Sequence, residues 1–315
     1  MYNYLEIFKQ AAKIAFKHPG IWFFGLLAAL LGTSGEAEVF FSSYANSGWL
    51  SFWQGLAGGG LFSAQGLQGL VKFFFASPLF VAAFAIVALA VLGLTVFITW
   101  LVIIAQTALI GQSVAISRKR PLSFGESFSL GVNKFWPVLG LNILLKLVIW
   151  LVISTIGVVA FLSFPFSFYV FILIFNLGMI AVLISSLISR YAICAVILRD
   201  NSFGGSFKTA WQLFKNNWLM TVEISILLFL ITWLANLILG ILSLVAFFYI
   251  FKFFSSWLFG ISLLSVLLFA AFVIVQIVLT IFSWATWSII FEIISSKKNL
   301  LVSRLISGWR ALLRH

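Results

Sequence analysis

Long uninterrupted apolar stretches are the feature that most constrains how this 315-residue chain can fold. A helix needs about 20 apolar residues to cross the roughly 30 Å hydrocarbon core of a bilayer. Five stretches exceed that length, and a shorter one near the N-terminus must use flanking residues to reach across. The six stretches are residues 21–32, 79–117, 137–164, 166–198, 218–250 and 257–294. We therefore predict an all-α integral membrane protein with six transmembrane helices in a single membrane domain, residues 1–315.

The overall composition supports a membrane protein over a soluble one. Hydrophobic residues make up 63% of the chain and charged residues 8%, whereas about 25% of an ordinary soluble domain is charged. A soluble fold of this size has too little interior to bury so much apolar surface. All five prolines lie at predicted helix edges or connections, where the missing amide hydrogen costs least. The proline positions thus agree with the predicted helix boundaries.

The basic residues lie mostly on one predicted side of the membrane. The chain has 19 Lys and Arg against 7 Asp and Glu, a net charge of +12. Only Lys72 and Lys252 fall on the side opposite both termini, and Lys146 and Arg190 fall within predicted spans. Because basic residues favour the cytoplasmic side, we predict a plasma (inner) membrane protein with both termini cytoplasmic. The excess charge then favours anionic phospholipid as a partner, and not nucleic acid.

The sequence offers little material for catalysis or metal binding. Its two histidines, His18 and His315, lie outside the predicted spans, and its single cysteine, Cys194, lies in an apolar stretch. The glycine-rich segment 55–60 lacks the Lys-Ser/Thr pair that completes a phosphate-binding loop. These residues supply neither a nucleophile with its base nor a set of metal ligands. We therefore predict a protein that is not an enzyme and that needs no metal or cofactor.

A recurring amphipathic pattern precedes each predicted pair of transmembrane helices. Its apolar residues are spaced i, i+4, i+7, i+8 and i+11, which places them on one face of a helix. The copies are Tyr4, Phe8, Ala11, Ala12 and Ala15; Phe124, Phe128, Gly131, Val132 and Phe135; Phe203, Phe207, Ala210, Trp211 and Phe214; and Leu301, Leu305, Gly308, Trp309 and Leu312. Any helix in a bilayer interface shows such a face. The Ser-Phe-Gly-x-Ser-Phe shared by residues 123–128 and 202–207 nevertheless favours duplication.

The pattern predicts three tandem parallel hairpin repeats, each preceded by a cytoplasmic amphipathic helix, and a C-terminal amphipathic helix. Their bounds are residues 3–118, 123–198, 202–295 and 299–315. The first repeat contains a long connection on the outer side, residues 33–77. Ser123 with Glu126, and Asn3 with Glu6, form predicted capping boxes at the same repeat position. Successive copies face the same way because each one adds two spans.

One passage resembles a known group of proteins. Residues 189–201, Ser-Arg-Tyr-Ala-Ile-Cys-Ala-Val-Ile-Leu-Arg-Asp-Asn, are followed at 206–213 by Ser-Phe-Lys-Thr-Ala-Trp-Gln-Leu. This passage resembles the end-of-span signature of uncharacterised bacterial polytopic membrane proteins related to the membrane domain of glycerophosphodiester phosphodiesterases. Cys194 or its neighbours replace a usual proline, and Arg199-Asp200 stands where a Glu is common. No stretch is polar enough to form the hydrolase domain, so the resemblance implies a membrane module without inherited catalysis.

Ionisable side chains within the predicted spans are the first candidates for a functional site, because charge in hydrocarbon is costly. The candidate intramembrane polar cluster lies in the cytoplasmic half of the membrane and consists of Lys146, Arg190, Glu223, Glu292 and Asn142. Three interpretations remain open. They are an ion pair of Arg190 or Lys146 with Glu223 that orders the helices, a basic pocket for a lipid phosphate, and a coupling-ion or substrate site of a transporter. We expect the other amides in the spans to be interhelical hydrogen-bond partners: Gln106, Asn176, Asn236 and Gln276.

The basic residues at the cytoplasmic surface are candidate contacts for lipid headgroups: Arg118, Lys119, Arg120, Lys297 and Lys298. Together with the aromatic amphipathic helices, they favour a non-enzymatic protein that engages anionic lipid at the inner leaflet in membrane or envelope organisation. The alternative is a transporter or permease subunit with a cavity between the repeats.

Overall fold

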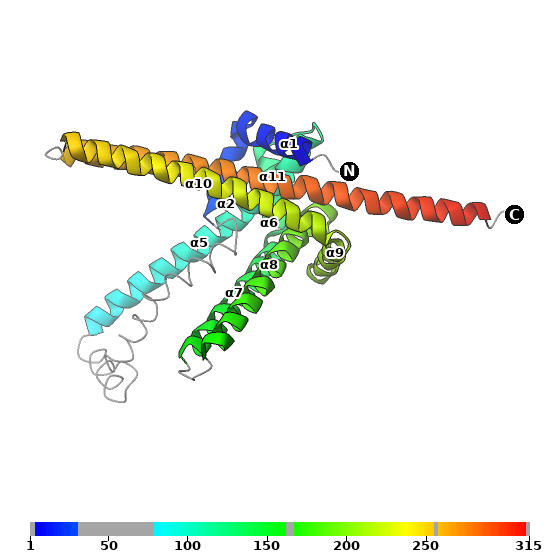
Figure 1. The fold of residues 1–315 in the computed structure, drawn as a ribbon, viewed down its shortest axis with the longest axis horizontal. Helices are drawn as coiled ribbons and strands as arrows, with labels where there is room; N and C mark the ends of the chain where they lie inside the picture. Colours follow the sequence, from blue (N-terminus) through cyan, green and yellow to red (C-terminus); the bar gives the residue numbers. More distant parts are fainter. Residues whose placement is uncertain (1–3, 31–77, 162–166, 255–257, 313–315) are drawn as a thin grey trace. The chain divides into compact units, whose positions relative to one another are not determined.

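The computed structural model describes residues 4–30, 78–161, 167–254 and 258–312, which are almost entirely helical (Figure 1). The elements are α1 (Tyr4–Lys17), a 3-10 turn (Pro19–Ile21), α2 (Trp22–Ala29), α5 (Pro78–Ser117), α6 (Phe124–Asn133), α7 (Phe135–Phe161), α8 (Ser167–Arg199), α9 (Phe203–Asn216), α10 (Trp218–Phe254) and α11 (Leu258–Leu312). These residues contain no β-strand. The described part of the chain is therefore all-α, as the sequence predicts.

Five helices are long and apolar enough to cross a membrane. The segments that meet this requirement are Val81–Ser117, Phe135–Ile156, Tyr169–Arg199, Trp218–Phe248 and Ser265–Ser296. The sixth predicted span, residues 21–32, corresponds to α2, which is 8 residues long. At 1.5 Å per residue, α2 covers only about 12 Å, and residues 31–77 lie outside the described ranges. The chain thus has the architecture of a multi-pass membrane protein, and the sixth span stays a prediction.

The last helix differs from the sequence prediction. We expected a separate helix over residues 299–315, but residues up to Leu312 continue α11 without a break. The stretch Ser-Ser-Lys-Lys-Asn at residues 295–299 contains neither Gly nor Pro, so nothing in it stops a helix. The amphipathic pattern in this segment shows which residues could share a face, but it does not show where a helix begins.

Two of the connections on the expected cytoplasmic side are tight turns with capped helix ends. α5 ends in a Schellman motif: Arg120 N donates to Ala115 O, and Lys119 N to Ile116 O, both at 2.9 Å. Lys119 has the required positive φ of 59°, and Asp200 has a φ of 58° at the end of α8. α6 then begins at Phe124, with Ser123 as its N-cap.

The predicted capping box at the start of α6 is confirmed. Ser123 Oγ accepts from Glu126 N at 3.3 Å, and Glu126 Oε2 accepts from Ser123 N at 2.7 Å. These hydrogen bonds lower the pKa of the Glu126 carboxyl, the backbone N–H of Ser123 contributing most. Ser202 caps α9 in the same way but without a glutamate, by accepting from Gly205 N at 3.4 Å. The second predicted capping box involves Asn3, which lies outside the described residues.

The chain divides into two compact units, of which the first comprises residues 1–33, 102–145 and 184–315. Its core contains α5, α8 and α11, and α8 contacts both of the others. A Cβ on Gly111 of α5 would lie 4.0 Å from Ile197 of α8, and Tyr191 of α8 lies edge-on to Trp287 of α11, with ring centroids 5.6 Å apart. Residues 102–114, 186–197 and 284–291 of these helices are buried on every face. The first compact unit is therefore built around α5, α8 and α11.

The second compact unit comprises residues 34–101 and 146–183, and its described parts belong to α5, α7 and α8. α7 and α8 pack closely at Gly178, where an added Cβ would lie 2.6 Å from Val152 Cγ1. Small residues allow this kind of close helix packing in membranes. Large apolar side chains on these segments are exposed, for example Ile86, Leu92 and Leu173. Such exposure is the expected surface of a helix that faces lipid.

Candidate functional site

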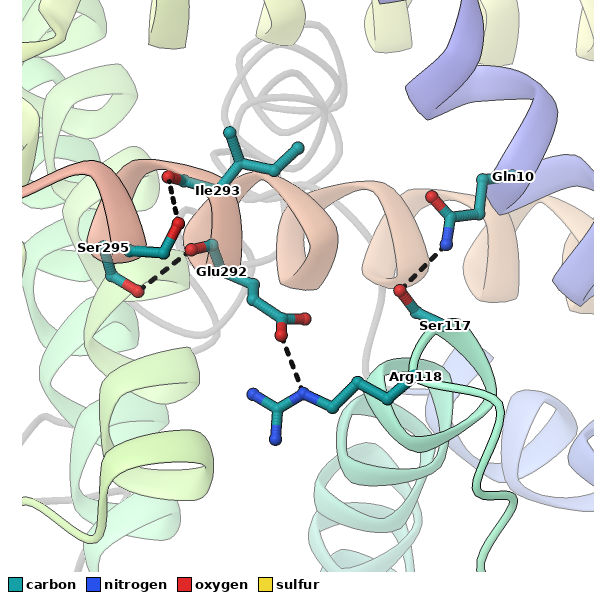
Figure 2. Close-up of polar contacts among 7 residues, drawn as sticks. Gln10, Ser117, Arg118, Glu292, Ile293 and Ser295 are labelled. Carbon is teal, nitrogen blue, oxygen red and sulfur yellow. Dashed lines mark hydrogen bonds and ion pairs between the residues drawn. The ribbon is translucent and has the colours of Figure 1, made fainter. Parts of the chain in front are cut away.

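Glu292 of α11 forms an ion pair with Arg118, which follows the end of α5. The distance between Arg118 Nε and Glu292 Oε1 is 2.7 Å (Figure 2). The side chains of Arg118 and Glu292 are 61% and 30% exposed, and an exposed pair contributes at most about 1 kcal/mol. Figure 2 also shows Gln10 of α1 donating to Ser117 of α5 at 2.8 Å. Residues from α1, α5 and α11 thus meet where α5 ends.

Glu223 of α10 has a partner from the N-terminal helix. Tyr4 Oη donates a hydrogen bond to Glu223 Oε2 at 2.6 Å, which joins α1 to α10. A hydrogen bond to a charged group is worth about 1.5–3 kcal/mol when water is excluded, and less at an exposed position such as this one. The described partner of Glu223 is therefore a tyrosine.

Arg190 of α8 is buried against an indole ring. Only 9% of the residue is exposed, and its guanidinium carbon lies 5.1 Å from the ring centroid of Trp287 in α11. This cation–π contact accommodates a positive charge in an apolar surrounding. Next to it, the hydroxyls of Tyr191 and Thr221 are hydrogen-bonded at 2.9 Å, which links α8 to α10.

The amides in the spans pair with one another across helices. Asn142 Nδ2 donates to Gln106 Oε1 at 2.9 Å and so joins α7 to α5. Gln276 Nε2 donates to Asn236 Oδ1 at 2.6 Å and so joins α11 to α10. The expectation that Gln106, Asn236 and Gln276 are interhelical hydrogen-bond partners is confirmed. Asn176 instead donates to a carbonyl of its own helix, Ile172 O, at 2.8 Å.

The candidate intramembrane polar cluster is divided between the two compact units. Lys146 belongs to the second unit, whereas Arg190, Glu223, Glu292 and Asn142 belong to the first. Each of these four residues has a described contact with a residue outside the predicted cluster: Trp287, Tyr4, Arg118 and Gln106. A single site formed by all five residues stays a prediction. The sequence pattern did not indicate these partners, because they come from other helices far away in the chain.

The candidate lipid-contacting residues follow the ends of α5 and of the α11 span. Arg118, Lys119 and Arg120 are exposed, and Arg118 also pairs with Glu292. Lys297 and Lys298 continue the α11 helix, and their side chains lie outside the described residues. The equivalent arginine at the end of α8, Arg199, donates from Nη2 to Ser295 O at 3.0 Å. Asp200 forms an ion pair with Lys134. Three basic residues near these helix ends, Arg118, Lys134 and Arg199, are thus held by specific contacts.

α9 exposes three of its four aromatic residues, and the fourth, Phe214, packs against the core. Phe203, Phe207 and Trp211 are 43%, 44% and 48% exposed. The residues that α9 buries are Ser206, Ala210 and Leu213. The sequence pattern placed Phe203, Phe207, Ala210 and Trp211 on one face, so it missed that the packed face is shifted toward Ser206 and Leu213. The Ser-Phe-Gly-x-Ser-Phe motif offered a signal for the buried face. Its second serine is Ser127 in α6 and Ser206 in α9, and both are buried.

Three buried polar atoms on α5 and α11 have no hydrogen-bond partner in the described structure. They are Gln112 Oε1, Thr280 Oγ1 and Trp287 Nε1. Leaving a buried polar group unpaired costs about 1–3 kcal/mol. Among the described residues, no group of three or more His, Cys, Asp or Glu side chains is placed to hold a metal ion.

Comparisons of this chain with protein families, with curated proteins and with solved structures find no match.

Proposed function

We propose that this chain is a non-enzymatic, multi-pass protein of the plasma (inner) membrane that engages anionic lipid at the inner leaflet. Its role would lie in membrane or envelope organisation. The proposal includes six spans in three parallel hairpin repeats, amphipathic helices on the cytoplasmic surface, and both termini in the cytoplasm. It also retains the relation to the membrane domain of glycerophosphodiester phosphodiesterases, which would supply a membrane module and no catalysis.

The exposed aromatic face of α9 is the observation that carries this proposal. A helix in water gains by burying Phe and Trp and exposing Ser, and α9 does the opposite. This inversion is favourable when the exposed face lies in the bilayer interface, where aromatic rings are enriched. α1 also exposes large apolar side chains, Leu5 and Phe16, although it buries Ile7 and Ile14.

Exposed lysines on the same helix support a preference for anionic lipid. Lys208 and Lys215 of α9 are exposed beside the aromatic face. A basic residue near an anionic membrane surface contributes about 1 kcal/mol of binding. That contribution corresponds to about a fivefold preference for anionic over zwitterionic headgroups for each lysine.

Lipid retention by the purified full chain tests the proposal. We expect native mass spectrometry from an equimolar mixture of phosphatidylglycerol and phosphatidylcholine to show preferential retention of phosphatidylglycerol. The double variant Lys208→Gln/Lys215→Gln should lose about fivefold of that preference per lysine. The matched control is Lys252→Gln, which removes one positive charge on the predicted outer side. An unchanged preference in the double variant, or an equal loss per lysine in the control, would refute the proposal.

A transporter or permease subunit is the second candidate, and the unpartnered atoms of Gln112, Thr280 and Trp287 favour it. Water or a polar solute between α5 and α11 would satisfy such atoms. Labelling of a Thr280→Cys variant with a small water-soluble thiol reagent tests this candidate. Reaction at this position, with Cys194 replaced by Ala, would support a water-accessible path. Complete protection of the new thiol would exclude such a path at Thr280.

A further inference from the structure

The three predicted repeats make matching contacts within the first compact unit. Tyr4, Phe124 and Phe203 hold the same position in the recurring pattern at the start of α1, α6 and α9. Phe124 stacks on Phe24 of α2 with ring centroids 4.9 Å apart, and Tyr4 binds Glu223 of α10. Phe24 lies 20 residues after Tyr4, and Glu223 lies 20 residues after Phe203, so Phe24 and Glu223 hold the same position in their repeats. The leading aromatic of each of these two repeats therefore contacts the matching position of another repeat.

The third leading aromatic completes the series. Phe203 of α9 lies against α7, where a Cβ on Gly140 would be 3.1 Å from Phe203 Cε2. Gly140 is one helical turn before Leu144, the residue that matches Phe24 and Glu223. Repeat 2 thus docks on repeat 1, repeat 3 on repeat 2, and repeat 1 on repeat 3.

A second set of contacts follows the same order. Asn142 and Thr221 hold the same position in repeats 2 and 3. Asn142 binds Gln106 of α5 at 2.9 Å, and Thr221 binds Tyr191 of α8 at 2.9 Å. Each therefore contacts the second long helix of the preceding repeat. For repeat 1 the corresponding helix is α11, and α2 packs on it at Gly25, whose added Cβ would lie 2.6 Å from Ile281 Cγ1.

The short helices dock through a small residue at a common position. Ala11, Gly131 and Ala210 match one another, and all three are buried. Gly131 of α6 lies on the backbone of Ile104 in α5, which belongs to repeat 1. α1 lies on α11, which belongs to repeat 3, with Phe8 and Phe282 ring centroids 5.8 Å apart. The contacts made by repeat 1 thus close the series back onto repeat 3.

We propose that the three repeats form a closed ring around α5, α8 and α11, and that the joint between repeat 3 and repeat 1 is where this ring opens. The inference rests on the three proposed repeats and is independent of lipid binding. Tight turns connect repeat 1 to 2 and repeat 2 to 3, whereas the ends that meet at the third joint are not consecutive in the chain.

The third joint also differs in its chemistry. Besides the apolar contacts of Phe8 and Gly25 with α11, it is held by the Tyr4–Glu223 hydrogen bond and by the Arg118–Glu292 ion pair. The positions that match Glu223 at the other joints are apolar, Phe24 and Leu144. Polar contacts at partly exposed positions can exchange with water or headgroups at little cost. Because no turn connects its two sides, the third joint can separate without a change in either tight turn, and its opening would admit a lipid chain or solute from the inner leaflet.

The single cysteine of the chain provides a built-in probe of ring opening. Cys194 lies in α8 at the centre of the ring and is 0% exposed. The measurement is the rate at which N-ethylmaleimide labels Cys194 in the full chain in nanodiscs, followed by intact mass. The test variant is Tyr4→Phe/Glu292→Leu, which removes both polar contacts of the third joint with little change in side-chain size. The control is Asn142→Leu, which removes a hydrogen bond at a joint that the chain itself connects.

We expect the test variant to be labelled at least tenfold faster than the wild type, and the control to stay within twofold of it. Equal labelling of the test variant and the wild type would overturn the opening joint. An equal increase in the control would show a general loosening of the helices and would overturn it as well. If the double variant fails to fold, Tyr4→Phe alone is measured against the same control, with the same two outcomes. Loss of lipid preference without a change in labelling would affect only the proposed function.

Discussion

Gly131 provides a sharp test of how α6 packs on α5. A Cβ at this position would lie 2.6 Å from Ile104 Cγ2, 2.7 Å from Ile104 O and 3.1 Å from Ile104 Cα. Two of these atoms belong to the backbone of a buried helix and cannot rotate away. Gly131→Ala therefore forces α6 away from α5. Gly125, on the same helix, has nothing within 4 Å of its added Cβ, so Gly125→Ala is a matched control.

The expected cost follows from the difference between these two variants. Alanine gains up to about 1 kcal/mol over glycine in a helix, and this gain is common to both substitutions. Overpacking of one methyl group costs about 1–3 kcal/mol, and only Gly131→Ala pays it. At about 2–4 °C per kcal/mol, Gly131→Ala should unfold about 2–12 °C below Gly125→Ala.

Thermal unfolding of both variants in the same detergent, followed by fluorescence-detected size exclusion, measures this difference. Gly125→Ala should be as stable as the wild type or slightly more stable. Equal midpoints for the two variants would refute the close approach of α6 to Ile104. They would also remove one of the matching contacts on which the ring is built.

Four further predictions concern local contacts and chain order. Ser123→Ala should destabilise the protein by about 0.5–2 kcal/mol in thermal unfolding at neutral pH, because it removes the cap of α6. The hydrogen bonds of Ser123 lower the pKa of Glu126. The stability that Glu126 contributes is therefore present above the ordinary carboxyl pKa of 4.5 and is lost as the pH falls through the lowered pKa. A pH series in which the stabilities of the wild type and Glu126→Gln keep a constant difference would contradict this. A double-mutant cycle of Gln276→Leu and Asn236→Leu should give a coupling of about 0.6 kcal/mol, and a value near zero would exclude their hydrogen bond. A circular permutant would begin at Ser123 and join the end of the α11 span to Tyr4. If the ring closes, this permutant should fold to a monodisperse protein in size exclusion. Consistent aggregation of the permutant, with a monodisperse parent chain, would count against closure.

Some site residues were accessible to sequence reasoning because their partners are near in sequence or are fixed by a simple chemical rule. The Ser123–Glu126 capping box needs only a spacing of three residues, and the structure contains it. Amides such as Gln276 and Asn236 in apolar helices must find partners, so their role as interhelical hydrogen bonders could be inferred although the pairing could not.

Other parts of the site were inaccessible to such reasoning. Arg118 was assigned to the lipid surface and Glu292 to an intramembrane cluster, yet the two side chains pair across 174 positions. Tyr4 was assigned only to an apolar stripe, yet it binds Glu223 across 219 positions. The face that α9 packs could not be read from its pattern either, because the aromatic stripe suits a bilayer interface as well as a protein core.

The sequence by itself determined that the chain is helical, where five membrane-length helices lie and how α6 begins. These properties are local, because a helix in a bilayer satisfies its backbone hydrogen bonds within its own segment. Only the tertiary structure decided that α5, α8 and α11 form the core of the first unit, which side of α9 is buried, and which partners Glu223 and Glu292 bind. Those outcomes depend on the order in which helices pack, and packing brings together residues whose separation in the chain carries no periodic signal.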